Sequence, residues 1–309
     1  MAGFSVVILA AGEGKRFHSR IPKVLHPICG KPMVSYIVDA ARELKPKRVV
    51  MVVQRDRAPD IDGVEFVVQE SPRGTGDALL AAEPLLDEEE DVLVLPGDVP
   101  LITSSTLLSL LKLHGGSFCT ILTTLLEDPT SYGRIVKSGE EVVKIVEERD
   151  ATQKEREIRE VNTSIYMFKT SAVFESLKDL SPENAQEEYY LTDVVGIVRE
   201  KGYRIGTFLA EDSEEVIGVN DRSALSYVGE ILQKRIIRRH QLLGVTISPP
   251  VVVDYDVKIG RDTTVHPFTA LYGKTVIGEG CIIGPNAVIV DSYIPSGTVV
   301  KPFSIFNRQ

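Results

Sequence analysis

An aliphatic residue recurs at every sixth position in the last part of the chain. These positions hold Ile247, Val253, Ile259, Val265, Leu271, Ile277, Ile283 and Ile289 without a miss. The phase then slips by one residue and resumes at Ile294, Val300 and Phe306. A six-residue period is typical of a parallel β-helix, in which each hexad supplies one short strand and turns its aliphatic side chain inward. Residues 245–309 therefore predict about three to four coils, and an ordinary β-sandwich is the weaker alternative.

Before residue 245, short apolar runs alternate with helical patterns. The runs that predict strands are 4–9, 48–53, 65–68, 92–95, 120–125, 134–136, 142–147, 163–168 and 205–210. The patterns that predict helices are 33–44, 76–86, 104–113, 192–201 and 222–243. Such alternation predicts βαβ units and an α/β fold with a doubly wound, mostly parallel sheet. We expect one domain over 1–221, a linker helix over 222–244 and the β-helix over 245–309.

Charge and cysteine usage exclude several classes of protein. The formal net charge of −9 argues against sequence-independent nucleic-acid binding, which needs a basic face. No apolar run approaches the roughly 18 residues that span a membrane, and no basic segment precedes the first apolar run, so neither a membrane protein nor a secretory signal is expected. The three cysteines are far apart and form no C-x-x-C, which predicts a reducing, cytoplasmic setting.

A glycine-rich loop follows the first predicted strand at residues 10–16. Backbone N–H groups of such a loop can approach phosphates closely. A Rossmann fingerprint would need a third glycine where Phe17 stands, and a P-loop would need one at Leu9. Four cations without an acid among them occur in the nine residues from Lys15 to Lys23. They favour an anion-binding loop over a solvated basic turn, because doubly wound sheets bind ligands at this end of the first strand.

An acidic residue follows a second buried strand. Asp98 lies three residues beyond the predicted strand 92–95. A single carboxylate there suits Mg²⁺, which takes only one or two from the protein and leaves phosphates and water to complete its shell. An Asx turn before the next helix is the alternative.

Nine short motifs resemble those of the sugar-nucleotide pyrophosphorylases in order and spacing. They are LAAGEGKR at 9–16, PKVLH at 22–26, GTG at 74–76, GDVPL at 97–101, YGRI at 132–135, IVE at 145–147, VNT at 161–163, YYLTD at 189–193 and GVN at 218–220. The set is most similar to the uridylyltransferase half of the bacterial bifunctional N-acetylglucosamine-1-phosphate uridylyltransferase/glucosamine-1-phosphate acetyltransferase family. The resemblance covers about residues 4–245.

This resemblance implies a role for each matching residue. The nucleotide would be surrounded by Leu9, Ala10, Ala11, Gly12, Gly14, Gly74 and Thr75, with Gln69 at the uracil edge. The catalytic residues would be Lys23, on the phosphates, and Arg16, near the departing pyrophosphate. The acetamido sugar would be bound by Gly133, Glu147 and Asn162, and Mg²⁺ would be held by Asp98 and Asn220.

The implied reaction is uridylyl transfer from UTP to N-acetylglucosamine-1-phosphate, giving UDP-N-acetylglucosamine and pyrophosphate for peptidoglycan precursors. Pro72 stands where relatives carry a second Gln near the base, and Pro96 stands where some carry Tyr. Another nucleotide or sugar phosphate therefore stays an alternative, as does a non-catalytic UDP-sugar sensor or scaffold.

The end of the chain departs further from the bifunctional relatives, whose left-handed β-helix is much longer. The stretch that carries their acetyl-transfer residues has no counterpart here. We therefore expect a short left-handed β-helix without acetyltransferase activity. Stacked β-helix faces form trimers in this family, so the resemblance also implies a homotrimer.

Overall fold

The computed structural model describes residues 3–115 and 117–307, which form two compact units. The first unit contains the chain up to Leu25 together with Met33–Asn220. The second contains His26–Pro32 and the chain from Asp221 onward. The segment His26–Pro32, which the sequence assigns to the first domain, thus groups with the second unit.

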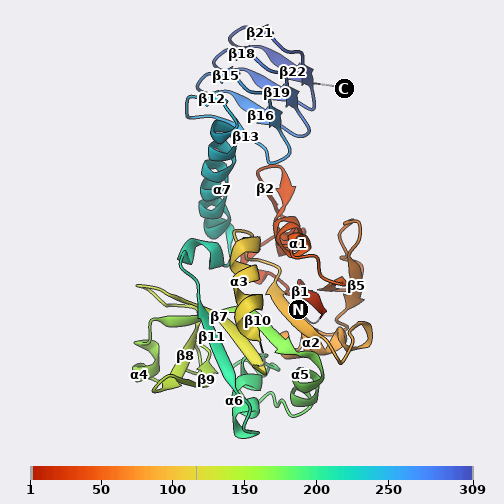
Figure 1. The fold of residues 1–309 in the computed structure, drawn as a ribbon, viewed down its shortest axis with the longest axis vertical. Helices are drawn as coiled ribbons and strands as arrows, with labels where there is room; N and C mark the ends of the chain where they lie inside the picture. The colour runs from red at the N-terminus through yellow and green to blue at the C-terminus, as the bar shows by residue number, and fades with distance from the viewer. Residues whose placement is uncertain (1–2, 116, 308–309) are drawn as a thin grey trace. The chain divides into compact units, whose positions relative to one another are not determined.

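A nine-stranded mixed sheet organises the described part of the first unit (Figure 1). Its main path runs in the order β11-β7-β10-β6-β1-β4-β5, and the hairpin β8–β9 joins through β10. Along that path only the two pairs made by β10 with β6 and β7 are antiparallel, so the mostly parallel sheet is confirmed. The strands are β1 (Phe4–Leu9), β4 (Val49–Val53), β5 (Glu65–Val68), β6 (Asp91–Pro96), β7 (Cys119–Leu125), β8 (Gly133–Ser138), β9 (Glu141–Val146), β10 (Glu160–Lys169) and β11 (Ile205–Leu209).

Buried apolar side chains form one cluster on each face of this sheet. Val6 and Ile8 of β1 belong to one cluster and Val7 to the other, because successive side chains of a strand point to opposite faces. Helices α1 and α3 pack into the first cluster, and α2, α5 and α6 into the second. The sheet is therefore doubly wound. The helices are α1 (Met33–Glu43), α2 (Thr75–Ala81), α3 (Ser104–His114), α4 (Gln153–Arg156), α5 (Thr170–Leu177) and α6 (Asp193–Glu200).

The helix expected over 76–86 is shorter than the sequence pattern indicates. α2 ends at Ala81, and a 3₁₀ turn, Glu83–Leu85, follows it. Pro84 lies within that turn and has no N–H to continue an α-helical ladder. The apolar residues after Ala81 therefore pack from a separate turn.

The second unit contains a long helix, α7 (Arg222–Leu242), and a small hairpin. Asp221 caps the helix, because its Oδ1 accepts a hydrogen bond from the Ala224 amide at 2.9 Å. The hairpin strands are β2 (Pro27–Ile28) and β3 (Lys31–Pro32). The turn between them is held within this unit, because the Cys29 carbonyl accepts a hydrogen bond from the Tyr255 amide at 2.9 Å.

Short parallel strands stack into coils in the rest of the second unit (Figure 1). The hexad positions 247, 265, 283 and 300 lie in register on one sheet, and 253, 271, 289 and 306 on the next. The predicted parallel β-helix is confirmed. The strands are β12 (Thr246–Ile247), β13 (Val252–Val253), β14 (Lys258–Ile259), β15 (Thr264–Val265), β16 (Ala270–Tyr272), β17 (Val276–Ile277), β18 (Ile282–Ile283), β19 (Val288–Val290), β20 (Tyr293–Ile294), β21 (Val299–Val300) and β22 (Ile305–Asn307).

The one-residue slip in the hexad phase is absorbed in a single turn. Ile277 pairs with Ile294, so the aliphatic side chains stay stacked despite the shorter coil. Asp291 lies in the shortened turn with φ of 45°, and its Oδ1 accepts a hydrogen bond from the Lys274 amide at 2.8 Å. The hexad positions from Ile247 to Val300 are buried, with Val265 and Leu271 fully covered, whereas Phe306 in the last strand is exposed.

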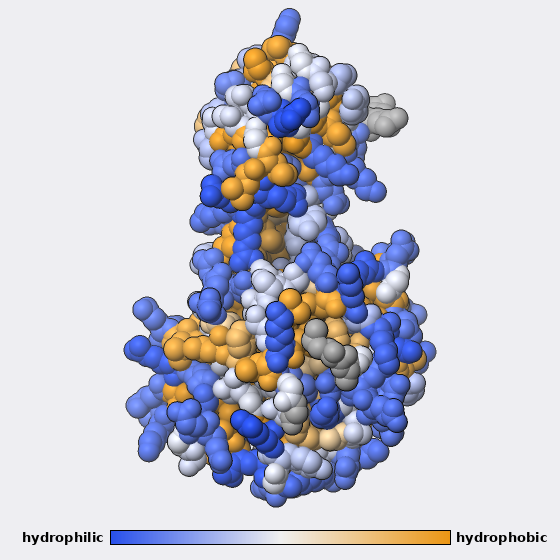
Figure 2. Space-filling view, in the orientation of Figure 1, coloured by the Kyte–Doolittle hydropathy of each residue, from blue (hydrophilic) through white to orange (hydrophobic). Residues whose placement is uncertain are grey.

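Other apolar side chains of the coils point outward. Phe268, Tyr293, Val299 and Ile305 are all exposed. Figure 2 shows apolar side chains on the visible face of the unit that carries the coils. Within the described part of the chain, every helix is too short or too polar to cross a bilayer.

Candidate active site

Two loops leave the middle of the first unit's sheet next to each other. β1 lies between β6 and β4 and runs parallel to both, so the order of strands reverses at β1. Ligands of doubly wound sheets bind at such a switch point, beyond the carboxyl ends of the strands. The glycine-rich loop follows β1 and Asp98 follows β6. The Gly97 amide donates a hydrogen bond to the Leu9 carbonyl at 2.9 Å, which ties the two loops together.

A cavity of about 890 Å³ lies at this edge of the sheet. Its volume is in the range of sites that hold ligands of nucleotide size. All of its lining residues belong to the first unit. The predicted site residues that line it are Leu9, Ala10, Ala11, Gly12, Gly14, Arg16, Lys23, Gln69, Gly74, Thr75, Asp98, Glu147 and Asn220. The two departures from the family pattern, Pro72 and Pro96, line it as well.

The glycine-rich loop approaches Lys23 closely at Gly14. Gly14 has φ of 62°, and a Cβ atom there would lie 2.7 Å from Cβ of Lys23. A side chain at this position would be strained and would also displace Lys23. The loop therefore needs glycine both for its backbone conformation and to hold the lysine in the cavity.

Gly14→Ala is expected to lower kcat by about tenfold, because Lys23 must shift, and to destabilise the fold by about 1 kcal/mol. Gly139→Ala is the matched control. Gly139 has nearly the same φ, 64°, but an added Cβ there would meet nothing within 4 Å. Thermal unfolding of both variants measures the backbone strain that they share. Steady-state kinetics measures the displacement of Lys23, which only Gly14→Ala should cause. An equal kcat in the two variants would contradict the proposed spacing.

Oxygen atoms of Asp98 and Asn220 converge on the ammonium group of Lys23. Lys23 Nζ pairs with Asp98 Oδ2 and lies 3.4 Å from Asn220 Oδ1. The Val219 amide donates a hydrogen bond to the Asp98 carbonyl at 2.8 Å, which holds the two segments together. Two oxygen donors directed at one positive charge fit Mg²⁺, which needs few protein ligands. The described residues contain no cluster of three or more His, Cys, Asp or Glu that suits a metal.

The part of the cavity lined by the GTG motif is closed by a segment distant in sequence. Gly74 has φ of 114°, and a Cβ atom there would lie 2.5 Å from the Tyr189 carbonyl oxygen. Tyr189 donates its amide to the Arg73 carbonyl at 2.7 Å, and Leu191 donates its amide to Thr75 Oγ1 at 3.0 Å. Hydrogen bonds therefore connect the GTG segment to the YYLTD motif, and the absence of a side chain at Gly74 permits this close contact.

Glu147 follows β9 and presents its carboxyl group to the cavity. Thr192 Oγ1 donates a hydrogen bond to Glu147 Oε1 at 3.2 Å. Burial raises the pKa of the Glu147 carboxyl above its ordinary value, and this hydrogen bond partly opposes the shift. A Cβ atom at Gly133 would lie 3.1 Å from Ile145 Cγ2 and 3.4 Å from Glu147 Oε1, so its tightest contact would be with Ile145. Gly133 itself is not among the residues that line the cavity.

Asn162 lies behind the cavity wall and is almost completely buried. Its Nδ2 donates a hydrogen bond to Tyr166 Oη at 2.7 Å, and its Oδ1 accepts one from the Ser164 amide at 3.1 Å. The pairing of β10 with β7 is irregular between Asn162 and Tyr166, and Ser164 has φ of 61°. Ser164 and Tyr166 both line the cavity, so Asn162 stabilises the bulge that presents them.

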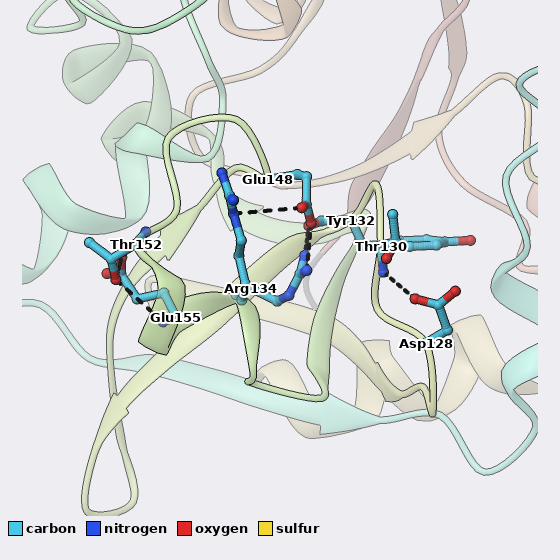
Figure 3. A network of polar contacts seen from close by, with 8 residues as sticks. Asp128, Thr130, Tyr132, Arg134, Glu148, Thr152 and Glu155 are labelled. Atoms are coloured by element: carbon cyan, nitrogen blue, oxygen red, sulfur yellow. Dashed lines mark hydrogen bonds and ion pairs between the residues drawn. The ribbon is translucent and has the colours of Figure 1, made fainter.

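A buried arginine hydrogen-bonds to two segments beside Glu147 (Figure 3). The Arg134 side chain is 2% exposed, and its guanidinium group donates to the Tyr132 carbonyl and to Glu148 Oε2, the latter at 2.5 Å. Tyr132 precedes Gly133 and Glu148 follows Glu147, so one side chain connects the two segments. Figure 3 shows Arg134 directed toward both partners.

Several lining residues received no role from the sequence. They are Glu13, Lys15, Arg149, Ser164, Tyr166, Ala185, Gln186, Glu188, Tyr190, Leu191 and Thr192, besides Val24 and Ala78. The YYLTD motif was a signal for Tyr190, Leu191 and Thr192, although spacing alone gives them no function. Arg149 follows the IVE motif and adds an exposed cation to the cavity lining.

The fold and this edge of the sheet define a nucleotidyltransferase domain joined to hexapeptide coils. The MobA-like NTP transferase domain family matches residues 6–162, and the bacterial transferase hexapeptide family (six repeats) matches residues 256–291. The chain belongs to the family of the bifunctional protein GlmU, and it is 48% identical to the member from Caldanaerobacter subterraneus subsp. tengcongensis over 94% of its own length. The identity is 46% for Thermoanaerobacter pseudethanolicus and 44% for Listeria monocytogenes serotype 4a, over 97% and 98% of this chain.

The chain spans about two thirds of the length of these relatives. It covers 65%, 67% and 68% of the three proteins, in the same order. Among solved structures, UDP-glucose pyrophosphorylase complexed with UDP-glucose is similar, with a TM-score of 0.62 at 19% identity. The likeness covers 76% of this chain and 100% of that one, and it supports the fold.

Proposed function

We propose that the first unit catalyses Mg²⁺-dependent uridylyl transfer from UTP to N-acetylglucosamine-1-phosphate, giving UDP-N-acetylglucosamine and pyrophosphate. One observation carries the proposal. The carboxyl edge of the sheet gathers a glycine-rich loop, Lys23, Asp98, Asn220 and Glu147 around a single cavity. The relatedness to bifunctional proteins GlmU supports the choice of nucleotide and sugar.

The reaction needs no general base, because the attacking sugar phosphate is already ionised near pH 7. Catalysis then depends on positioning and on stabilising charge as the α-phosphoryl group is transferred in line. Lys23 is positioned to neutralise that charge. Arg16 is exposed on the cavity wall, where its fork of donors suits the departing pyrophosphate.

Asp98 and Asn220 are the residues that would hold Mg²⁺. The bound ion supplies charge neutralisation for the phosphates. In this structure the Lys23 ammonium group contacts the oxygen atoms of Asp98 and Asn220, the two residues proposed to hold the ion. In the proposed complex the lysine exchanges this carboxylate for a substrate phosphate, since both are anionic acceptors.

The test is pyrophosphate release with UTP, Mg²⁺ and N-acetylglucosamine-1-phosphate, run beside glucose-1-phosphate. Release with the acetamido sugar alone is expected. Release with glucose-1-phosphate alone would retain the nucleotidyl chemistry and overturn the sugar assignment. If UTP gives no release with either sugar and another nucleotide does, the uridylyl assignment is wrong. Tight UDP-sugar binding with no turnover would favour a sensor instead.

Glu147→Gln is expected to raise KM for N-acetylglucosamine-1-phosphate by about tenfold at pH 8, because a charged acceptor is replaced by a neutral one. The raised pKa of Glu147 means that the carboxylate takes up a proton at a higher pH than an ordinary glutamate. In the parent protein KM should therefore rise as pH falls toward that pKa, whereas the variant should lack this component. Glu140→Gln, at an exposed hairpin position, is the control. If KM depends on pH in the same way in the parent and in Glu147→Gln, Glu147 does not bind the sugar phosphate.

The coils of the second unit are proposed to assemble three chains. The outward apolar side chains of Tyr293, Val299 and Ile305 support a buried face in the assembly. Light scattering should give three times the chain mass of 34.0 kDa, and a monomer would contradict the proposal. The expectation that the chain lacks acetyl transfer stays a prediction, tested by thiol release from acetyl-CoA with glucosamine-1-phosphate.

A further inference from the structure

The side-chain amide of Gln69 is held by two protein acceptors. Gln69 follows β5, is 7% exposed and lines the cavity. Its Nε2 donates one hydrogen bond to the Gly74 carbonyl at 3.1 Å and another to Asp77 Oδ2 at 2.8 Å. Both hydrogens of the amide nitrogen are therefore used within the protein.

These partners fix which way the amide faces. A backbone carbonyl and a carboxylate can only accept hydrogen bonds, so turning the amide over would set its oxygen against two other oxygens. The buried position makes such an arrangement costly, because neither oxygen would find a donor. Gln69 consequently presents Oε1, an acceptor, as its polar atom for a ligand.

Asp77 is itself held in place. It lies in the first turn of α2, and its other oxygen, Oδ1, accepts a hydrogen bond from Arg73 Nη2 at 2.6 Å. The Arg73 guanidinium group also lies 5.7 Å from the centre of the Tyr189 ring. The carboxylate therefore has one oxygen on the guanidinium group and one on Gln69.

An acceptor at this position distinguishes the pyrimidine bases. Uracil carries N–H at ring position 3, whereas cytosine has an acceptor nitrogen there. The neighbouring lining residue Pro72 has no backbone N–H and no polar side chain, so it cannot supply a donor that would suit cytosine. A site built to accept a hydrogen bond from the base discriminates strongly against a base that has no N–H at that position.

We propose that Asp77 is a positioning residue for base selection: by holding Gln69 Nε2, it makes Gln69 Oε1 select the N3–H of uracil and reject cytosine. This inference rests on the proposed function, since it concerns the nucleotide of the same site. Asp77 acts only through Gln69.

Asp77→Asn tests the proposal. In this variant the side-chain oxygen at position 77 should still accept from Arg73, which can only donate. The side-chain nitrogen at position 77 then faces Gln69. An amide nitrogen cannot accept from Gln69 Nε2, so only the Gly74 carbonyl still holds the original orientation, and we expect the turned amide, which offers Nε2 to the base, to become populated. We expect the ratio of kcat/KM for UTP to that for CTP to fall by about tenfold or more, because a donor then faces the base where uracil needs an acceptor. A merely structural role would lower both values and leave the ratio unchanged.

Three further reagents sharpen the test. Glu70→Gln is the matched control, because it makes the same acid-to-amide change beside Gln69, in an exposed ion pair with Arg55, and its ratio should equal that of the parent. Arg73→Gln loosens Asp77 without altering α2, so a smaller decrease in the ratio is expected even if Asp77→Asn fails to fold. UTP methylated at N3 lacks the selected proton and should be a poor substrate for the parent protein.

Two results would overturn the inference: a parent protein without preference for UTP over CTP, or an unchanged ratio in folded Asp77→Asn. Failure of the proposed function is distinguished by calorimetry. If the parent releases no pyrophosphate, the proposed reaction is wrong, and the ratio of Kd values for UTP and CTP then decides the role of Asp77 in the same variants.

Discussion

Asp98→Ala is expected to abolish Mg²⁺-dependent turnover, lowering kcat by about 10³-fold or more. Asp98 is the charged member of the oxygen pair with Asn220, and an amide oxygen alone is a weak ligand for a hard cation. The measurement is pyrophosphate release over a Mg²⁺ titration. Asn220→Ala should keep more activity and shift the titration to higher Mg²⁺, because it leaves the carboxylate in place.

Asp179→Asn is the control for this experiment, since Asp179 forms an exposed ion pair with Lys201. It should leave both kcat and the Mg²⁺ requirement unchanged. Full activity of Asp98→Ala at the Mg²⁺ concentration that saturates the parent protein would move the metal site elsewhere. Equal losses in Asp98→Ala and Asp179→Asn would indicate a general effect on folding.

The architecture of both units was predictable because each rests on local periodicity. Strands such as Phe4–Leu9 and Glu65–Val68 have the bounds that their apolar runs predict, although the second of them is only partly buried. The hexad period fixed the coils, including the slip after Ile289, because an inward position must stay apolar at every step. The helix over 76–86 was overextended, because its apolar pattern continues past Pro84 into a 3₁₀ turn.

Long-range contacts were not predictable from the same signals. The hairpin around Cys29 groups with the second unit through the distant Tyr255, and no local pattern marks that pairing. The contact of Gly74 with Tyr189 is likewise invisible in sequence, although the left-handed φ explains the glycine afterwards. Such contacts depend on how loops meet, which periodicity does not encode.

The proposed site separates into residues on the cavity wall and residues behind it. Lys23, Asp98 and Glu147 line the cavity, as their proposed roles require. Asn162 does not, and its side chain is used to hold Ser164 and Tyr166. A motif match ranks these residues alike, because it records identity at a position and not the direction of a side chain. Asp77 shows the converse, since it matched no expected role yet orients Gln69.

Lys23→Ala is expected to lower kcat by about 10²–10³, with a smaller effect on KM for UTP. The Lys23 side chain is 13% exposed, and its ammonium group contacts Asp98 and Asn220, beside which the proposed reaction would develop charge on the transferred phosphoryl group. Its stabilisation is therefore needed most in the transition state, and a loss confined to that state lowers kcat.

Lys23→Arg and Lys201→Ala complete this comparison. Arginine keeps the charge but not the compact ammonium geometry, so Lys23→Arg should recover only part of kcat. Lys201 pairs with Asp179 on the surface, and its loss should change neither constant. Because a lysine that only binds substrate would raise KM and spare kcat, an unchanged kcat in Lys23→Ala would exclude the catalytic role. The split between the two constants therefore decides whether this cation stabilises the transition state or only holds the nucleotide.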